Sequence, residues 1–167
     1  MNKSRVFLAG LIVSLFVGSG VAQAADKFAY IDLSRTFSEY NKTKDYDKVL
    51  SDKEKVYTTD RDKKISDLKA LQDKMNLLND KDKEAKRTEL QNKVKTMQDY
   101  DRQKQGELRK DQEDRMKEIL KDIEEAVKKY SEKEGYTLVF NDRVLVYQTK
   151  SMDITNDIVA MLNKGAK

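Results

Sequence analysis

The sequence predicts a mainly α-helical protein in which a long helical hairpin is inserted into a small strand-rich body. Residues 41–134 contain no Pro and a single Gly, and their apolar residues recur at spacings of three and four, as one stripe of a helix requires. Short runs of β-branched and aromatic residues flank this stretch on both sides. We therefore expect residues 25–40 and 135–167 to form the body and residues 41–134 to form an arm.

The first 24 residues are expected to be an export signal that is removed from the mature protein. Lys3 and Arg5 precede an apolar run from Val6 to Val17, and small residues follow at Ala22 and Ala24, where signal peptidase cleaves. The apolar run is shorter than the roughly 20 residues that a membrane-spanning helix needs. We expect cleavage after Ala24 and, in a bacterium with two membranes, release into the periplasm.

Composition argues against an enzyme. The chain has no Cys and no His, which excludes disulfides, zinc sites built from these residues, a Cys nucleophile and His-dependent triads. No phosphate-binding glycine loop and no calcium-binding loop pattern occurs, and the many carboxylates are explained by solvated helix faces. We expect no cofactor and no metal. Loss of Lys3 and Arg5 with the signal lowers the net charge from +4 to +2, which argues against strong nucleic-acid binding.

The arm is expected to fold back on itself near 79–83. Asn79 and Asp80 are residue types that satisfy free amides at a helix start, and Glu84 would lie favourably in the first turn of the returning helix. The resulting register places three sets of apolar residues opposite each other: Ile65 with Thr96 or Met97, Leu68 with Val94, and Leu71 with Leu90.

The carboxyl-terminal part predicts two strands and a short helix. Gly135 is a plausible helix stop, and the β-branched and aromatic runs 136–140 and 143–147 are separated by Asn-Asp, which predicts a β-hairpin. Both faces of these strands are largely apolar, so both should be covered. Asp153 is expected to be the N-cap of a final helix that ends before Gly165.

The compact part of the body, residues 28–40 and 135–163, has only about 42 residues, which is too small to be stable alone without disulfides, a metal or association with other subunits. Residues 27–40 begin as a third short apolar strand. Three short strands with unpaired edges favour the same conclusion, because subunits could pair these edges and close a shared barrel. We expect an obligate oligomer from which arms project.

The end of the arm is expected to be positive. Residues 81–95 carry a net charge of +3, whereas the whole mature chain carries +2. Several arms in one oligomer would multiply this field and attract anionic membrane surfaces or acidic polypeptides, although a solvated charge run explains the same residues. The basic residues concerned are Lys81, Lys83, Lys86, Arg87, Lys93 and Lys95.

Long, thinly hydrophobic arms could enclose a large, soft partner. Leu77 and Tyr100 fit the seam between the helices least well and are the better candidates for contact with a partner, whereas most of the other apolar residues are needed to hold the hairpin together. The full set of candidate contacts comprises Met75, Leu77, Leu78, Val94, Met97 and Tyr100.

The sequence resembles the Skp/OmpH family of periplasmic chaperones over essentially the whole mature chain. The resemblance is carried by the opening FAYIDL at 28–33 and by YTLVF at 136–140, VLVY at 144–147 and MDITNDIVAMLNK at 152–164. The arm resembles the family mainly in length and texture.

This resemblance implies a trimer shaped like a jellyfish, in which a β-barrel body carries three helical tentacles around a cavity. It implies an ATP-independent holdase that keeps unfolded outer-membrane β-barrel proteins soluble, with contact to anionic lipid or lipopolysaccharide at the arm ends. By position, the body would be built by Ile31, Leu33, Val139, Leu145 and Val146. Two alternatives stay open from the residues: a structural envelope tether, and a basic binder of lipopolysaccharide or nucleic acid.

The sequence also predicts a soft zone midway along the arm. Residues 58–64 and 101–107 contain no large apolar residue and lie opposite each other in the expected register, and Gly106 costs about 1 kcal/mol relative to Ala in a helix. The alternative is a hydrated stretch held by charge pairs along each helix. We expect faster amide hydrogen exchange at 101–107 than at 119–127, and equal or slower exchange there would rule out the soft zone.

Overall fold

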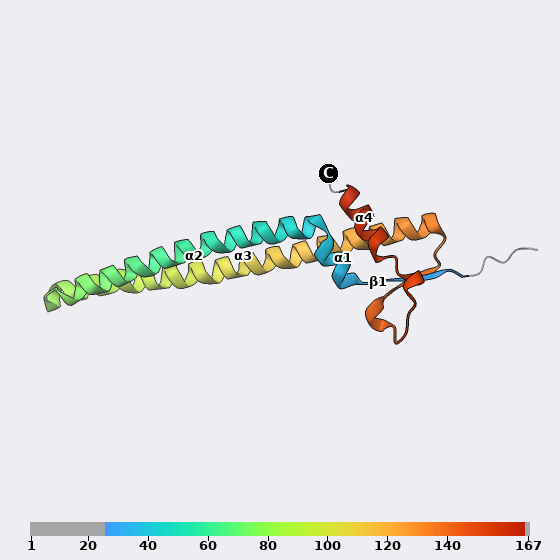
Figure 1. Cartoon of the computed structure of the whole chain (residues 1–167). Helices are drawn as coiled ribbons and strands as arrows, with labels where there is room; N and C mark the ends of the chain where they lie inside the picture. The colour runs from blue at the N-terminus through green and yellow to red at the C-terminus, as the bar shows by residue number, and fades with distance from the viewer. Residues whose placement is uncertain (1–25, 166–167) are drawn as a thin grey trace, which may run out of the picture.

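A computed structural model of the chain describes residues 26–165, so the expected export signal lies outside the described residues. A long two-helix arm projects from a small body, and both ends of the described chain lie in that body (Figure 1). The prediction of a mainly helical protein with a hairpin arm and a small strand-containing body is confirmed. Within the described range, every helix is too polar or too short to cross a membrane.

The arm is formed by α2 (Asn41–Asn76) and α3 (Asp80–Glu134), which run antiparallel (Figure 1). The turn between them begins at Leu77, slightly before the expected 79–83, and Asn79 is the N-cap of α3, accepting a hydrogen bond from the Asp82 backbone N–H at 3.0 Å. With 36 residues, α2 is about 54 Å long. The longer α3 continues past the start of α2 into the body, so one helix connects the arm end to the core.

Gly135 ends α3, as the sequence predicts. Its φ of 74° lies in the left-handed region, and its backbone N–H donates to the Ser131 carbonyl at 2.9 Å. A residue with a side chain rarely adopts this conformation, which explains why a glycine marks the end of a 55-residue helix.

The sheet has two parallel strands. β1 (Phe28–Ile31) pairs with β2 (Leu138–Asn141), with Phe28 opposite Leu138 and Ile31 opposite Asn141. Parallel neighbours need a long crossover connection, and here the entire arm is that connection.

The predicted hairpin of 136–140 and 143–147 is wrong. A two-residue hairpin loop requires positive φ in its turn, and among residues 26–165 no residue other than glycine has positive φ. After β2, the chain enters the 3-10 helix η1 (Asp142–Val144) instead, with the Asn141 side chain accepting from the Arg143 backbone N–H. The segment 143–147 is therefore not a strand. One chain alone does not provide the cover that both faces of the strands were expected to have.

The core lies where α4 (Thr155–Gly165) packs against α3 and β1. Ile158 is completely buried, and Leu162 is also buried. Their cluster draws on the carboxyl-terminal half of α3 and on β1 through Ala29, Ile31, Ile119, Ile123 and Ala126. The buried apolar face of α4 closes the body.

Short polar contacts fix the ends of the body helices. Asp32 is the N-cap of α1 (Leu33–Glu39) and accepts from the Arg35 backbone N–H at 2.8 Å. At α4, the first helical hydrogen bond goes to the Ile154 carbonyl, so the predicted N-cap, Asp153, lies one residue before the actual capping position. Its carboxylate still accepts from the Thr155 backbone N–H at 2.9 Å and so stabilises the helix start.

Replacing Ile158 with Ala should lower the free energy of unfolding by about 2 to 5 kcal/mol, because the substitution removes buried apolar contacts and leaves a cavity. Urea unfolding at a fixed protein concentration measures the change. Val56→Ala on the exposed arm is the control and should change stability by less than about 0.5 kcal/mol. Equal losses in the two variants would contradict this placement of the core.

Candidate functional site

The candidate client-contact residues divide into a buried and an exposed group. Met97 is only 8% exposed and lies in the seam between α2 and α3, with Met75 and Leu78 half-buried. Leu77, in the turn, is 87% exposed. Leu77 therefore projects from the end of the arm, while Met97 contributes to holding the arm together.

Tyr100 lies within the seam, contrary to the expectation that it fits the seam poorly. Its ring is tilted against the ring of Tyr57, with 6.0 Å between centroids, and its hydroxyl donates to Asp60 at 3.3 Å. The ammonium of Lys64 lies 4.9 Å from the centre of the same ring. Burial raises the pKa of the Tyr100 hydroxyl, and the negative charge of Asp60 adds to this effect.

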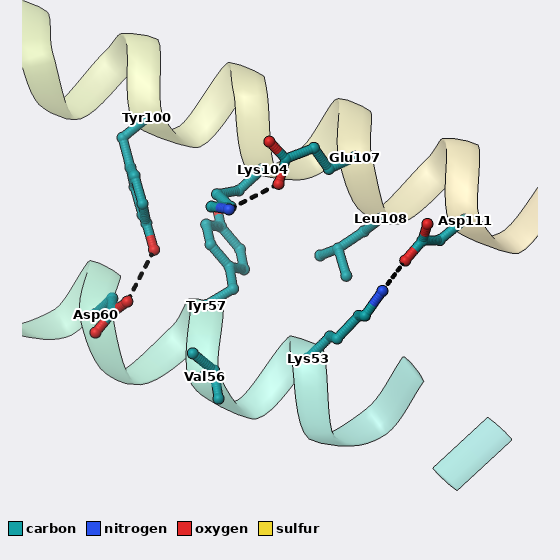
Figure 2. A pocket seen from close by; sticks show the side chains of 9 residues that line it. All are labelled: Lys53, Val56, Tyr57, Asp60, Tyr100, Lys104, Glu107, Leu108 and Asp111. Carbon is teal, nitrogen blue, oxygen red and sulfur yellow. Dashed lines mark hydrogen bonds and ion pairs between the residues drawn. The ribbon is translucent and has the colours of Figure 1, made fainter. Parts of the chain in front are cut away.

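A cavity of about 240 Å³ interrupts the seam midway along the arm (Figure 2). The Tyr57 hydroxyl donates to Asp101 at 3.1 Å, and Lys104 donates to Glu107 at 2.7 Å. The cavity is lined by Lys53, Val56, Tyr57, Asp60, Tyr100, Lys104, Glu107, Leu108 and Asp111. Where the sequence predicts a soft zone, the Tyr57–Tyr100 ring contact is therefore accompanied by polar contacts between the helices.

The expected register of the arm is confirmed in this region. Arg61 in α2 pairs with Asp101 in α3 at 3.4 Å, so the two stretches that lack large apolar residues do lie opposite each other. Nearer the arm end, Leu68 lines one cavity together with Lys93, which is next to its predicted partner Val94. Whether the middle of the arm is soft stays a prediction.

Partly exposed apolar side chains follow the arm from the body to the turn. They do not gather in one pocket, and both helices contribute them. The members are Val49, Val56, Ile65, Leu77, Val94, Met116 and Leu120. Val49 and Val56 were missed by the sequence reasoning, although their spacing of seven residues places them on one face of α2.

The basic residues near the arm end are partly neutralised within the arm. Lys86 pairs with Glu89 at 2.6 Å, and Arg87 pairs with Glu84 at 3.1 Å. The other four, Lys81, Lys83, Lys93 and Lys95, make no ion pair with any residue of the described range, and Lys93 lines the same cavity as Leu68.

The candidate body residues do not all enter the core of one chain. Ile31 is buried and Leu33 and Val139 pack against the core, whereas Leu145 is half-buried. Val146 is fully exposed in the single chain, because 143–147 forms no strand that could turn this side chain toward the core. Its predicted place in an oligomeric body stays a prediction.

Within 26–165, no group of three or more Asp or Glu side chains is arranged to hold a metal ion. The cavities along the arm are open grooves between charged helix surfaces. The arrangement is suited to contact with a large partner along the whole arm.

A family model described as outer membrane protein (OmpH-like) matches residues 27–162, which cover the body, the whole arm and most of α4. The chain belongs to this OmpH-like family. The Chaperone protein Skp of Yersinia enterocolitica is 28% identical over 160 residues, covering 93% of this chain and 97% of the relative. The protein of the same name from Pectobacterium atrosepticum is 28% identical over 162 residues, covering 94% and 97%.

A solved structure shows the same OmpH-like fold. The crystal structure of an OmpH-like protein from Caulobacter crescentus superposes with a TM-score of 0.76 over 86% of this chain and 88% of that chain, at 17% sequence identity. The family resemblance that was noted from the sequence is therefore confirmed, both by sequence and by fold.

Proposed function

We propose that the protein is an ATP-independent holdase of the periplasm, which binds unfolded outer-membrane β-barrel proteins and prevents their aggregation. The observation that carries the proposal is the distribution of partly exposed apolar side chains along a long, charged arm. An unfolded polypeptide presents apolar side chains at many points and in no fixed arrangement. A surface with many weak apolar contacts suits such a partner better than a single pocket.

The relatives support this class of function. The curated proteins that match the chain over nearly their whole length are named as chaperones. The matching family model is described as outer membrane protein (OmpH-like). Removal of the first 24 residues on export would leave the body and arm intact, since the described elements begin at Phe28. No nucleotide-binding motif occurs in the sequence, which is consistent with binding and release without ATP.

Weak contacts along several arms would capture a client while its chain stays mobile. After the first contact, each further contact forms at a high effective concentration, so affinity accumulates without a dominant site. Leu77 at the turn and the apolar residues on the outer faces of α2 and α3 are the proposed contacts. The charges between them keep the free arm in solution.

The proposed assembly is a homotrimer in which three arms enclose a cavity. The surface of the body supports self-association, because apolar side chains of both strands and of the following segment are exposed in one chain. These residues are Phe28, Leu138, Phe140, Val144, Val146 and Tyr147. Large exposed apolar patches on soluble proteins mark interaction sites, and residues 25–40 with 135–167 are accordingly the proposed trimerisation body.

The basic residues at the arm end are proposed to contact anionic surfaces, including membrane lipid or lipopolysaccharide. Lys81 and Lys83 lie in the first turn of α3, where the helix dipole opposes positive charge. The fold therefore gains little from these lysines. A partner with negative charge would explain their position.

A light-scattering assay tests the holdase. A urea-unfolded outer-membrane β-barrel protein is diluted into buffer without ATP, with or without purified residues 25–167. We expect suppression of scattering at about one oligomer per client, persisting at moderate salt because the contacts are largely apolar. Unchanged scattering from a folded oligomer would reject the proposal and favour a structural tether of the envelope. Loss of binding at moderate salt would favour the alternative of a basic protein that binds lipopolysaccharide or nucleic acid.

Distributed binding predicts that single substitutions have small effects. Leu77→Ser should weaken client affinity by about fivefold or less, since one exposed apolar contact contributes roughly 1 kcal/mol. Combining it with Val56→Ser and Met116→Ser should weaken affinity by more than about tenfold. The measurement is fluorescence titration of a labelled client.

The matched control places Ser at three exposed polar positions of the arm: Gln72, Gln91 and Gln98. This triple variant should bind as the unmodified protein does. Complete loss of binding in Leu77→Ser, with the oligomer still folded, would contradict distributed contacts.

A further inference from the structure

The helices α1 and α2 are separated by a sharp break at Tyr40. This residue ends α1 and precedes α2, with an extended backbone (φ −68°, ψ 125°) that interrupts helical hydrogen bonding. Breaks of this kind leave carbonyl groups of the first helix and N–H groups of the second helix without helical partners. The break must therefore be stabilised from elsewhere in the fold.

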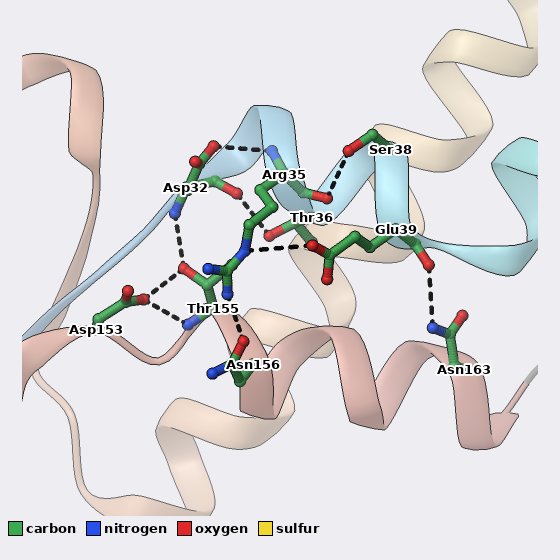
Figure 3. Close-up of polar contacts among 9 residues, drawn as sticks. All are labelled: Asp32, Arg35, Thr36, Ser38, Glu39, Asp153, Thr155, Asn156 and Asn163. Carbon is green, nitrogen blue, oxygen red and sulfur yellow. Dashed lines mark hydrogen bonds and ion pairs between the residues drawn. The ribbon is translucent and has the colours of Figure 1, made fainter.

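Asn163 in α4 supplies partners on both sides of the break. Its side-chain oxygen accepts from the Asn41 backbone N–H at 2.8 Å. Its amide nitrogen donates to the Glu39 carbonyl at 3.1 Å (Figure 3). One side chain of the carboxyl-terminal helix thus binds the last turn of α1 and the first turn of α2 together.

The opposite side of the break is attached to α3. The Tyr40 ring is buried in the core, and its hydroxyl donates to Asp122 at 3.2 Å. The Lys42 ammonium lies between two carboxylates of α3, at 2.6 Å from Asp122 and 2.7 Å from Glu118. We call Tyr40, Lys42 and Asn163, together with these partners, the root clamp.

The ionisation of this cluster keeps the root clamp charged at neutral pH. Burial alone would lower the pKa of Lys42, but its hydrogen bonds to Asp122 and Glu118 raise it above its ordinary value. The hydrogen bond from Lys42 holds the pKa of Glu118 below its usual range, with a further hydrogen bond from Tyr46. The ion pair therefore persists between the acid range, where Glu118 becomes protonated, and strongly alkaline pH.

The root clamp occupies a mechanically important place. α3 runs without interruption from the turn into the core, whereas α2 ends at the break. Two adjacent rods bend easily if one slides along the other, and they resist bending if both of their ends are joined. The turn at Leu77 joins the helices at the arm end, and the root clamp joins them at the body.

The middle of the seam resists sliding less than a closely packed apolar seam would. It contains the 240 Å³ cavity, and besides the Tyr57–Tyr100 ring contact it is joined by hydrogen bonds and ion pairs of long side chains, which can exchange partners. We propose that the root clamp makes the arm stiff by preventing α2 from sliding along α3, with Asn163 and Lys42 as the positioning residues. The stiffness of the arm does not rest on the proposed function.

Spin labels measure the stiffness directly. The chain has no Cys, so Leu77→Cys at the turn and Ala160→Cys on the exposed face of α4 introduce two unique labelling sites. Labelled protein is diluted with an excess of unlabelled protein, so that distances within one chain dominate. We expect the distance distribution to be narrow in the otherwise unmodified protein and clearly broader after Lys42→Met or Asn163→Leu.

Lys44→Met is the matched control, because it makes the same change of charge two residues away at an exposed position. It should leave the distribution unchanged. Amide hydrogen exchange provides a second readout: loss of the two Asn163 hydrogen bonds should accelerate exchange at residues 41–44 by roughly tenfold, with residues 119–127 unchanged.

An unchanged distance distribution in both clamp variants would overturn the proposal. If Lys42→Met lowers the helix content, Asn163→Leu decides the question, since it leaves every charged group in place. Uniformly faster exchange at residues 41–44 and 119–127 would also overturn the proposal, because it would show a general loss of stability. Neither measurement uses a client, so a failure of the holdase assay leaves this result independent.

Discussion

The packing of α4 against α3 is the interaction on which the rest of the molecule depends. Ile158 and Leu162 of α4 meet Ile119 and Ile123 of α3, and β1 closes the same core. The arm has no comparable core of its own, because its apolar stripe is thin and partly exposed. The position of the arm therefore derives from one end of α3, which is held in the body by the last helix of the chain.

This separation of a packed body from a thinly packed arm fits a protein that binds a partner along an extended surface rather than in a pocket. The body concentrates burial in a few residues, while the arm is stabilised by hydrogen bonds and ion pairs such as Tyr57 with Asp101 and Arg61 with Asp101. Individually exposed ion pairs contribute little to stability. An arm of this composition can present apolar side chains to a partner without becoming an aggregation site itself.

The features that sequence predicted correctly are set by local chemistry. The stop at Gly135, the cap at Asn79 and the helical spacing between them depend on neighbours within a turn or two. The predicted hairpin after Gly135 was wrong because the β-branched residues at 143–147 favour a strand by local propensity alone. A strand also needs a partner strand, and local propensity does not supply one. The inward position of Tyr100 and the contacts of Asn163 depend on how whole helices are rotated and crossed, which spacing alone does not specify.

The parallel pairing of β1 with β2 has a consequence for the order of folding. Asp32, directly after β1, contacts Thr155, and these residues are 123 positions apart in the chain. Contacts of such long range form late, because closing the long intervening loop costs conformational entropy before the contacts contribute any stability. Helices depend on local contacts and therefore form fast. Because synthesis proceeds from the amino terminus, β1 is made first, and its partner strand and the last helix are made last. Helix formation in the arm is therefore expected before the body closes.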